Sequence, residues 1–116
     1  LAVFKAMTLD PSTPTASLPA WQSGELLSFR LADLQGRLSF KALLECRGGN
    51  SFALALPGQP YRRLRPTSPT RTEWDSGPIV GGRPAGTKDT NWTVSKESEA
   101  QNCCLVTIST SAAKKG

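Results

Sequence analysis

Histidine is absent from the 116 residues of this chain, and only three cysteines are present. Without histidine, the sequence has neither the usual base for a serine nucleophile nor the nitrogen ligands of a zinc site. No apolar run reaches the roughly 18 residues of a membrane span, and residues 1–7 lack the charged start and cleavage site of a signal peptide. We therefore expect no catalytic residue, no metal, no cofactor and no membrane insertion.

Helical periodicity is missing as well. Ten glycines and nine prolines interrupt the chain, and apolar residues do not recur at the i, i+3, i+4 and i+7 positions of an amphipathic helix. They alternate with polar residues instead, which is the period of half-buried strands. We predict an all-β fold, a compact β-barrel or jelly-roll-like sandwich of about seven to eight mostly antiparallel strands. Residues 1–116 form one domain, with the barrel over 1–110 and a frayed polar end over 111–116.

The segment Gly24–Leu56 shows this alternation most clearly, over three successive stretches. Between the first two, Asp33 is suited to start a turn and Gly36 to take a left-handed conformation. Arg47–Asn50 offers a similar connection to the third. Because the strands follow one another so closely, we predict that they form a meander, each paired with the next.

Other segments predict further strands and the connections between them. Residues 2–7 predict an edge strand protected by Lys5, Leu9–Pro19 an extended connection between two sheets, and Trp21 a plug at one end of the fold. Cys103–Ser109 predicts a central strand, because both of its faces are fairly apolar. The predicted core contains Phe29, Leu31, Leu38, Phe40, Phe52, Leu54, Val106 and Ile108.

The three cysteines, Cys46, Cys103 and Cys104, form an odd set. Adjacent residues of a strand point to opposite faces, so Cys103 and Cys104 are poorly placed to bridge each other. The odd number favours a reducing compartment, while a bridge from Cys46 to either of the other two remains open. Asn91–Thr93 fits the acceptor pattern for N-glycosylation, but the cysteine count argues against a secretory route and so against its use.

Positive charge is concentrated in the second half of a chain whose net charge is +5. The densest basic group could contact sulfate or carboxylate groups of cell-surface glycans, with nearby aromatic rings stacking on a sugar face. The candidate ligand or receptor contacts are Tyr61, Arg62, Arg63, Arg65, Arg71 and Trp74. The glycine-rich segment Ile79–Thr90 predicts a long surface loop and a second candidate. The alternative is an ordinary surface, with Arg62 and Arg63 paired to Glu73 and Asp75.

The segment Asp75–Gly82 superficially matches two short signatures of trypsin-like proteases. A serine nucleophile needs a group that takes its proton, and no histidine or suitably spaced lysine is present. Ser76 is therefore expected to be a turn residue.

A series of short motifs runs from Leu18 to Ser76: a leucine-proline and an aromatic, an LLxF strand, GRxxF, a glycine turn, GQ, a proline turn, and an aromatic before Asp-Ser. The residues are Leu18, Pro19, Trp21, Leu26, Leu27, Phe29, Gly36, Arg37, Phe40, Leu44, Gly49, Gly58, Gln59, Pro66, Trp74, Asp75 and Ser76. In this order they resemble the last part of the capsid protruding domain of caliciviruses, noroviruses in particular. Those domains are larger, with an inserted subdomain that carries most glycan contacts, so the compact size is more similar to nodaviruses and tombusviruses.

The resemblance implies a structural protein, the spike domain of a small non-enveloped positive-strand RNA virus. It further implies a homodimer that attaches to a host-cell glycan or receptor, in a virion assembled in the host cytoplasm. Two alternatives remain. A nucleic-acid-binding barrel needs aromatics beside the arginines; only Tyr61 lies close in sequence, so we do not expect a nucleic-acid partner. An extracellular immunoglobulin-like adhesion domain is superficially compatible with the order Cys46, Trp74, Cys103.

Overall fold

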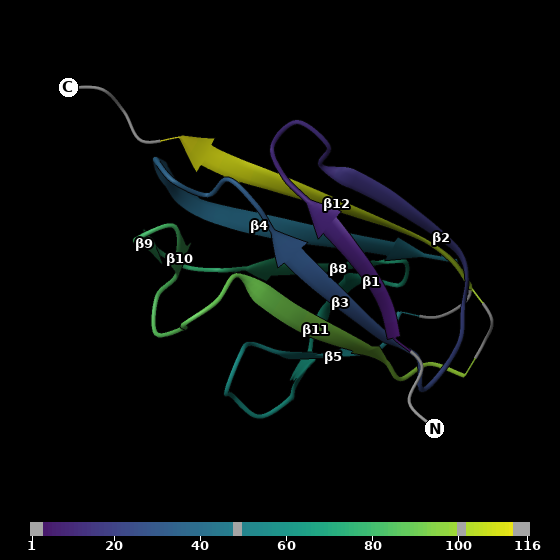
Figure 1. Cartoon of the computed structure of the whole chain (residues 1–116). Coiled ribbons are helices and arrows are strands. Elements are labelled where there is room, and N and C mark those ends of the chain that lie inside the picture. Colours follow the sequence, from purple (N-terminus) through teal and green to yellow (C-terminus); the bar gives the residue numbers. More distant parts are fainter. Residues whose placement is uncertain (1–3, 48–49, 100–101, 113–116) are drawn as a thin grey trace.

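Two five-stranded sheets pack face to face in the computed structural model, which describes residues 4–47, 50–99 and 102–112 (Figure 1). The strands are β1 (Phe4–Leu9), β2 (Thr15–Trp21), β3 (Leu26–Leu31), β4 (Arg37–Cys46), β5 (Phe52–Ala55), β6 (Arg62–Leu64), β7 (Pro66–Ser68), β8 (Arg71–Asp75), β9 (Ile79–Val80), β10 (Arg83–Pro84), β11 (Asn91–Lys96) and β12 (Asn102–Ala112).

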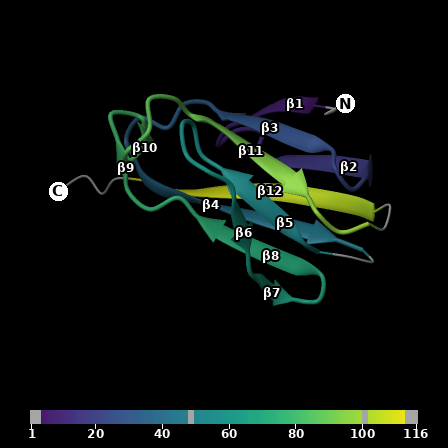
Figure 2. The same ribbon diagram turned by 90° about the horizontal axis from the view of Figure 1, so that it is seen from below.

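The front sheet has the order β1-β3-β11-β5-β6 and the back sheet the order β2-β12-β4-β8-β7, while β9 and β10 form a small separate hairpin. Among the pairings that the structure describes, only β1 with β3 is parallel. Figure 2 shows β6, β7 and β8 lying together at one edge of the sandwich. The predicted all-β, mostly antiparallel fold is confirmed, as a sandwich with open edges rather than a closed barrel.

The strand pairings are nested, like a long hairpin folded over on itself. From the outside inward, β2 pairs with β12, β3 with β11, β4 with β8, and β5 with β6, each pair antiparallel. Folding this ribbon brings β12 beside β4 and β11 beside β5, which completes the two sheets. Such nesting is the strand order of a jelly roll, a double-sheet architecture of two Greek keys. The jelly-roll-like prediction is therefore confirmed.

The predicted meander is wrong. Of its three strands, β3 and β5 lie in the front sheet on either side of β11, whereas β4 lies in the back sheet. Alternation correctly identified each strand as having one inward face, but it carries no information about which strand is the neighbour. In the first connection Gly36 has the predicted left-handed φ of 76°, but the hydrogen-bonded turn runs from Leu34 to Arg37, so Asp33, with a φ of 57°, precedes the turn and does not start it. Part of the second connection, residues 48–49, lies outside the described residues.

The first strand, β1, is an edge strand, as predicted. On it, Lys5 Nζ forms an ion pair with Glu25 Oε2 at 3.5 Å. The expected extended connection is shorter than predicted, because β2 already begins at Thr15. Its Pro19 is tolerated since β2 is also at an edge, where a missing N–H costs no ladder bond.

Asp10 stabilises the short connection between β1 and β2, where the chain crosses from the front sheet to the back sheet. One oxygen of its carboxylate accepts hydrogen bonds from the backbone N–H groups of Ser12 and Thr13, each at 2.8 Å, and from both hydroxyls. These bonds, led by that of the Ser12 hydroxyl, favour the ionised form and lower the pKa of Asp10 to about 2.

Two other boundaries differ from prediction. The last strand continues to Ala112, so the frayed end does not begin at residue 111; residues 113–116 lie outside the described residues. The predicted long loop Ile79–Thr90 contains the β9–β10 hairpin. Two-residue strands carry too little alternation to be recognised from sequence.

The core is a single layer of apolar side chains between the sheets. Trp92 of the front sheet stacks on Trp74 of the back sheet at 5.0 Å between ring centroids, and on Phe29 at 4.5 Å. Trp21 is fully buried, and its Nε1 donates to the backbone oxygen of Glu25 at 3.1 Å, so its predicted role as a plug is confirmed.

Seven of the eight residues predicted for the core are buried, and Leu38 is the exception at 54% exposed. β8 pairs with β4 only from Lys41 to Glu45, so the start of β4 extends past this neighbouring strand. Leu38 lies in that extension, on the same side of β4 as the buried Phe40, but its side chain is exposed there.

Candidate functional site

Trp74 is not on the surface. It is only 6% exposed, with Phe40 and Trp92 against its ring and the guanidinium of Arg62 at 6.0 Å from the ring centre. The prediction that it stacks on a sugar face is therefore wrong for this fold. The alternation of β8 contained the signal, since Thr72 and Trp74 point inward while the residues between them point outward. Tyr61, in contrast, is half exposed.

The four candidate arginines do not form one cluster. Arg63 lies on the outer surface of the front sheet, where two of its nitrogens bind the carboxylate of Glu97 at 3.2 and 3.1 Å. That hydrogen-bonded pair raises the pKa of Arg63. Arg71 lies on the outer surface of the back sheet. Its Nε is 3.2 Å from Oε2 of Glu45, the direct cross-strand neighbour of Arg71. The two surfaces face opposite sides of the sandwich.

The predicted pairs of Arg62 and Arg63 with Glu73 and Asp75 are not formed either. Arg62 covers Trp74 at the sandwich edge, and Arg65 is exposed and makes no ion pair within the described part of the chain. Sequence proximity did not predict these positions because the chain changes sheets between β6 and β7.

The two candidate contact regions, the arginine-containing segment from Arg62 to Arg71 and the glycine-rich segment Ile79–Thr90, also lie apart. Thr70, in the turn before β8, accepts a hydrogen bond from Cys46 at the end of β4 (3.1 Å), whereas Ser76, which leads into the glycine-rich segment, donates to Phe40 near its start (2.9 Å). They therefore lie toward opposite ends of the sandwich and cannot share one outer end. Ser76 is a turn residue, as expected: its hydroxyl donates to Gly77 O and accepts from Phe40 N.

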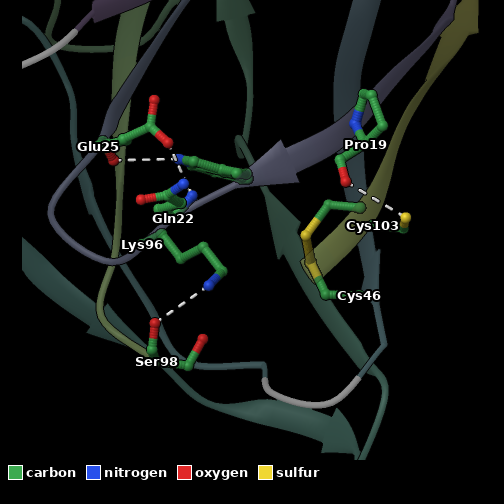
Figure 3. The surroundings of a disulfide bond; sticks show 9 residues. Pro19, Gln22, Glu25, Cys46, Lys96, Ser98 and Cys103 are labelled. Carbon is green, nitrogen blue, oxygen red and sulfur yellow. Dashed lines mark hydrogen bonds between the residues drawn. A yellow bond between two sulfur atoms is a disulfide. The ribbon is translucent and has the colours of Figure 1, made fainter. Parts of the chain in front are cut away.

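The cysteines are not all reduced. Cys46 on β4 and Cys104 on β12 are direct cross-strand neighbours and form a disulfide, while Cys103 points outward and its thiol donates to Pro19 O at 3.3 Å (Figure 3). The structure selects one of the two bridges that the sequence left open. The choice depends on the register between β4 and β12, which alternation does not reveal.

At the same end of the sandwich, the front sheet buries the amino group of Lys96. Its side chain is 1% exposed, and Nζ donates to Ser98 O at 3.0 Å (Figure 3). Burial lowers the pKa of Lys96, and the negative charge of Glu25 partly opposes this shift. Lys96 was not identified from the sequence as a buried cation.

A hollow lies beside the disulfide, on the outer surface of the back sheet. It has a volume of about 530 Å³ and is lined by Ser17, Glu45, Cys46, Arg47, Thr70, Cys103, Cys104 and Leu105. Leu105, 39% exposed, lies opposite Glu45, and the next outward pair along the strands is Leu43 with Thr107. We call Leu43, Glu45, Leu105 and Thr107 the back patch.

The back patch and its hollow combine apolar side chains, hydroxyls and an ion pair. The volume is within the usual range of about 300–1,000 Å³ for ligand sites, but the hollow is open to solvent, which suits a protruding group of a macromolecule. Of the predicted contacts, only Arg71 lies close, through its bond to Glu45. The outward Leu105 was the sequence signal for this surface, but we attributed it to the central position of the strand.

The chain matches no protein-family model, no curated protein and no solved structure. Its described residues contain no helix long and apolar enough to cross a membrane. They also contain no group of three or more histidine, cysteine or acidic side chains arranged to hold a metal ion. Function must therefore be inferred from the fold and surfaces of this chain.

Proposed function

We propose that this chain is the protruding domain of a viral capsid, a non-enzymatic module that pairs with a second copy and attaches the virion to its host cell. The observation that carries this proposal is the nested strand order β2–β12, β3–β11, β4–β8 and β5–β6. Jelly rolls of this kind are typical of viral capsid and lectin domains. The motif order from Leu18 to Ser76 supports the same choice.

Self-association is assigned to the back patch. In a two-fold dimer the same surface meets itself, so Leu43 and Leu105 of one copy pack against those of the other. Arg71 and Glu45 lie beside these leucines and can exchange partners across the two-fold axis. Apolar side chains on an outer sheet surface are the feature expected of a surface that is covered in the assembled state. Tethering in the capsid raises the effective concentration, so the isolated domain needs only weak affinity.

Sedimentation velocity of the whole chain tests this assignment. We expect wild type to dimerise as concentration rises, and Leu105→Asp to remain monomeric because a buried carboxylate would lack a partner. Leu38→Asp is the matched control, since Leu38 is a more exposed leucine at the other end of the same sheet. A wild type that stays monomeric at the highest soluble concentration, or equal effects of both variants, would overturn the assignment.

An exported binding domain is the second candidate, and the Cys46–Cys104 disulfide favours it. Disulfides persist in oxidising compartments and are rare in the cytoplasm, where the proposed capsid would assemble. This candidate would be a lectin-like jelly roll rather than an immunoglobulin sandwich. In immunoglobulin domains the disulfide joins the two sheets, whereas here it joins neighbouring strands of one sheet.

A further inference from the structure

The acceptor motif Asn91–Thr93 occupies the first three residues of β11, a central strand of the front sheet. Trp92 points into the core and is 1% exposed, so Asn91 and Thr93 both point outward. The side chain of Asn91 is exposed, and its Nδ2 donates to Asp89 Oδ2 at 3.1 Å, another exposed group. The acceptor amide is therefore on the surface of the folded chain.

Space for a sugar exists on both sides of Asn91. One hollow of about 400 Å³ is bordered by Ala6, Thr8, Ser28 and Arg30, and another of about 420 Å³ by the segment Ala55–Gln59. Asn91 lines both hollows, and most of the side chains around it are small. The larger side chains at their borders include Arg30, the direct cross-strand neighbour of Asn91, whose exposed guanidinium can move aside for a sugar.

The disulfide supplies independent support. The sequence argued against a secretory route because the cysteine number is odd; the structure pairs Cys46 with Cys104 in a disulfide, which favours an oxidising compartment, and leaves Cys103 unpaired. Oxidation of cysteine pairs and transfer of glycans to asparagine occur in the same compartment of eukaryotic cells. Two unrelated features of the chain thus point to the same route.

We propose that Asn91 is a site of N-linked glycosylation. A bond forms between Asn91 Nδ2 and the anomeric carbon of a lipid-linked oligosaccharide, the lipid pyrophosphate leaves, and the amide gives up one proton. The glycan then covers the outer surface of the front sheet and leaves the back patch free. This inference rests on the exported alternative and is incompatible with a capsid that assembles in the cytoplasm, because a chain that stays in the cytoplasm does not meet the donor.

The experiment expresses the whole chain behind an export signal in eukaryotic cells and treats the product with peptide-N-glycosidase. We expect a mobility shift on treatment, and conversion of residue 91 to aspartate in the mass spectrum of its peptide. Asn91→Gln and Thr93→Ala should abolish both signals, whereas the matched control Thr93→Ser keeps the acceptor pattern and should retain them.

A folded, disulfide-bonded wild type with the unmodified mass would overturn the proposal, and so would a shift that persists in Asn91→Gln. If Thr93→Ala fails to fold, Asn91→Gln alone decides, since its exposed side chain has only one described hydrogen bond to lose. Dimerisation through the back patch is measured separately on the deglycosylated protein. Failure of one proposal is therefore distinguishable from failure of the other.

Discussion

The two sheets of the sandwich are alike on their inner surfaces and different on their outer surfaces. Inside, both contribute tryptophan and phenylalanine to one aromatic cluster. Outside, the central strands of the front sheet carry Leu26 and small residues such as Ser28, Thr93 and Ala55, whereas the back sheet carries Leu43 and Leu105 beside the hollow of about 530 Å³. The inner surfaces are similar because both sheets must bury apolar side chains to form the core. We propose that a partner covers the leucines on the outer surface of the back sheet, and we place the function there.

The largest expected effect tests the shared interior. Trp92→Ala removes a ring that contacts Phe29, Phe40 and Trp74, and we expect it to lower the free energy of unfolding by about 3–5 kcal/mol. Denaturant unfolding measures this loss. Tyr61→Ala, at an exposed ring, should change stability by no more than about 0.5 kcal/mol. If the two variants lost equal stability, the two sheets would not share this core.

A smaller effect tests a feature that belongs to the back sheet alone. The Cys46–Cys104 bridge links residues 58 positions apart, so replacing both cysteines by alanine should lower the free energy of unfolding by about 2–4 kcal/mol, mainly through the freer unfolded chain. Cys103→Ala is the control and should leave stability unchanged, because its thiol is exposed. A large loss with Cys103→Ala, similar to that of the double variant, would indicate that Cys46 bridges Cys103 instead, because the double variant removes Cys46 and so breaks either bridge.

The smallest effect concerns the sandwich edge, between the two outer surfaces. One double variant, Arg62→Ser with Arg65→Ser, removes two arginines that make no ion pair with the described residues. The other, Arg63→Ser with Arg71→Ser, removes two that bind carboxylates, and both variants lose the same charge. We expect the first to elute from heparin at lower salt than the second, since paired guanidinium groups are already neutralised. Equal elution would mean that net charge, not this edge, governs retention.

The fold was predictable as far as local periodicity determines it. Alternation identified the strands around Phe29, Phe40 and Phe52 and their inward side chains, because the face of a strand is decided by nearest neighbours in sequence. It could not identify strand partners, since pairing β3 with β11 joins residues more than half the chain apart. The error of the meander and the unresolved choice of disulfide have this common cause.

The candidate site was less predictable for the same reason. The arginines from Arg62 to Arg71 are neighbours in sequence, yet the change of sheet after β6 distributes them over opposite surfaces. The back patch, in contrast, combines Leu43 and Leu105, which are distant in sequence and come together through the β4–β12 register. A surface built from two such strands leaves only a weak sequence signal, an outward leucine.

Hydroxyl-radical footprinting across a concentration series tests the central claim, that the outer surface of the back sheet is the association surface, most directly. We expect that oxidation of Leu105 and Leu43 falls as the protein becomes more concentrated, while oxidation of Leu38 and of the front-sheet residue Met7 stays constant. Protection of Met7, or unchanged oxidation of Leu105 in a sample that sedimentation shows to be dimeric, would contradict it.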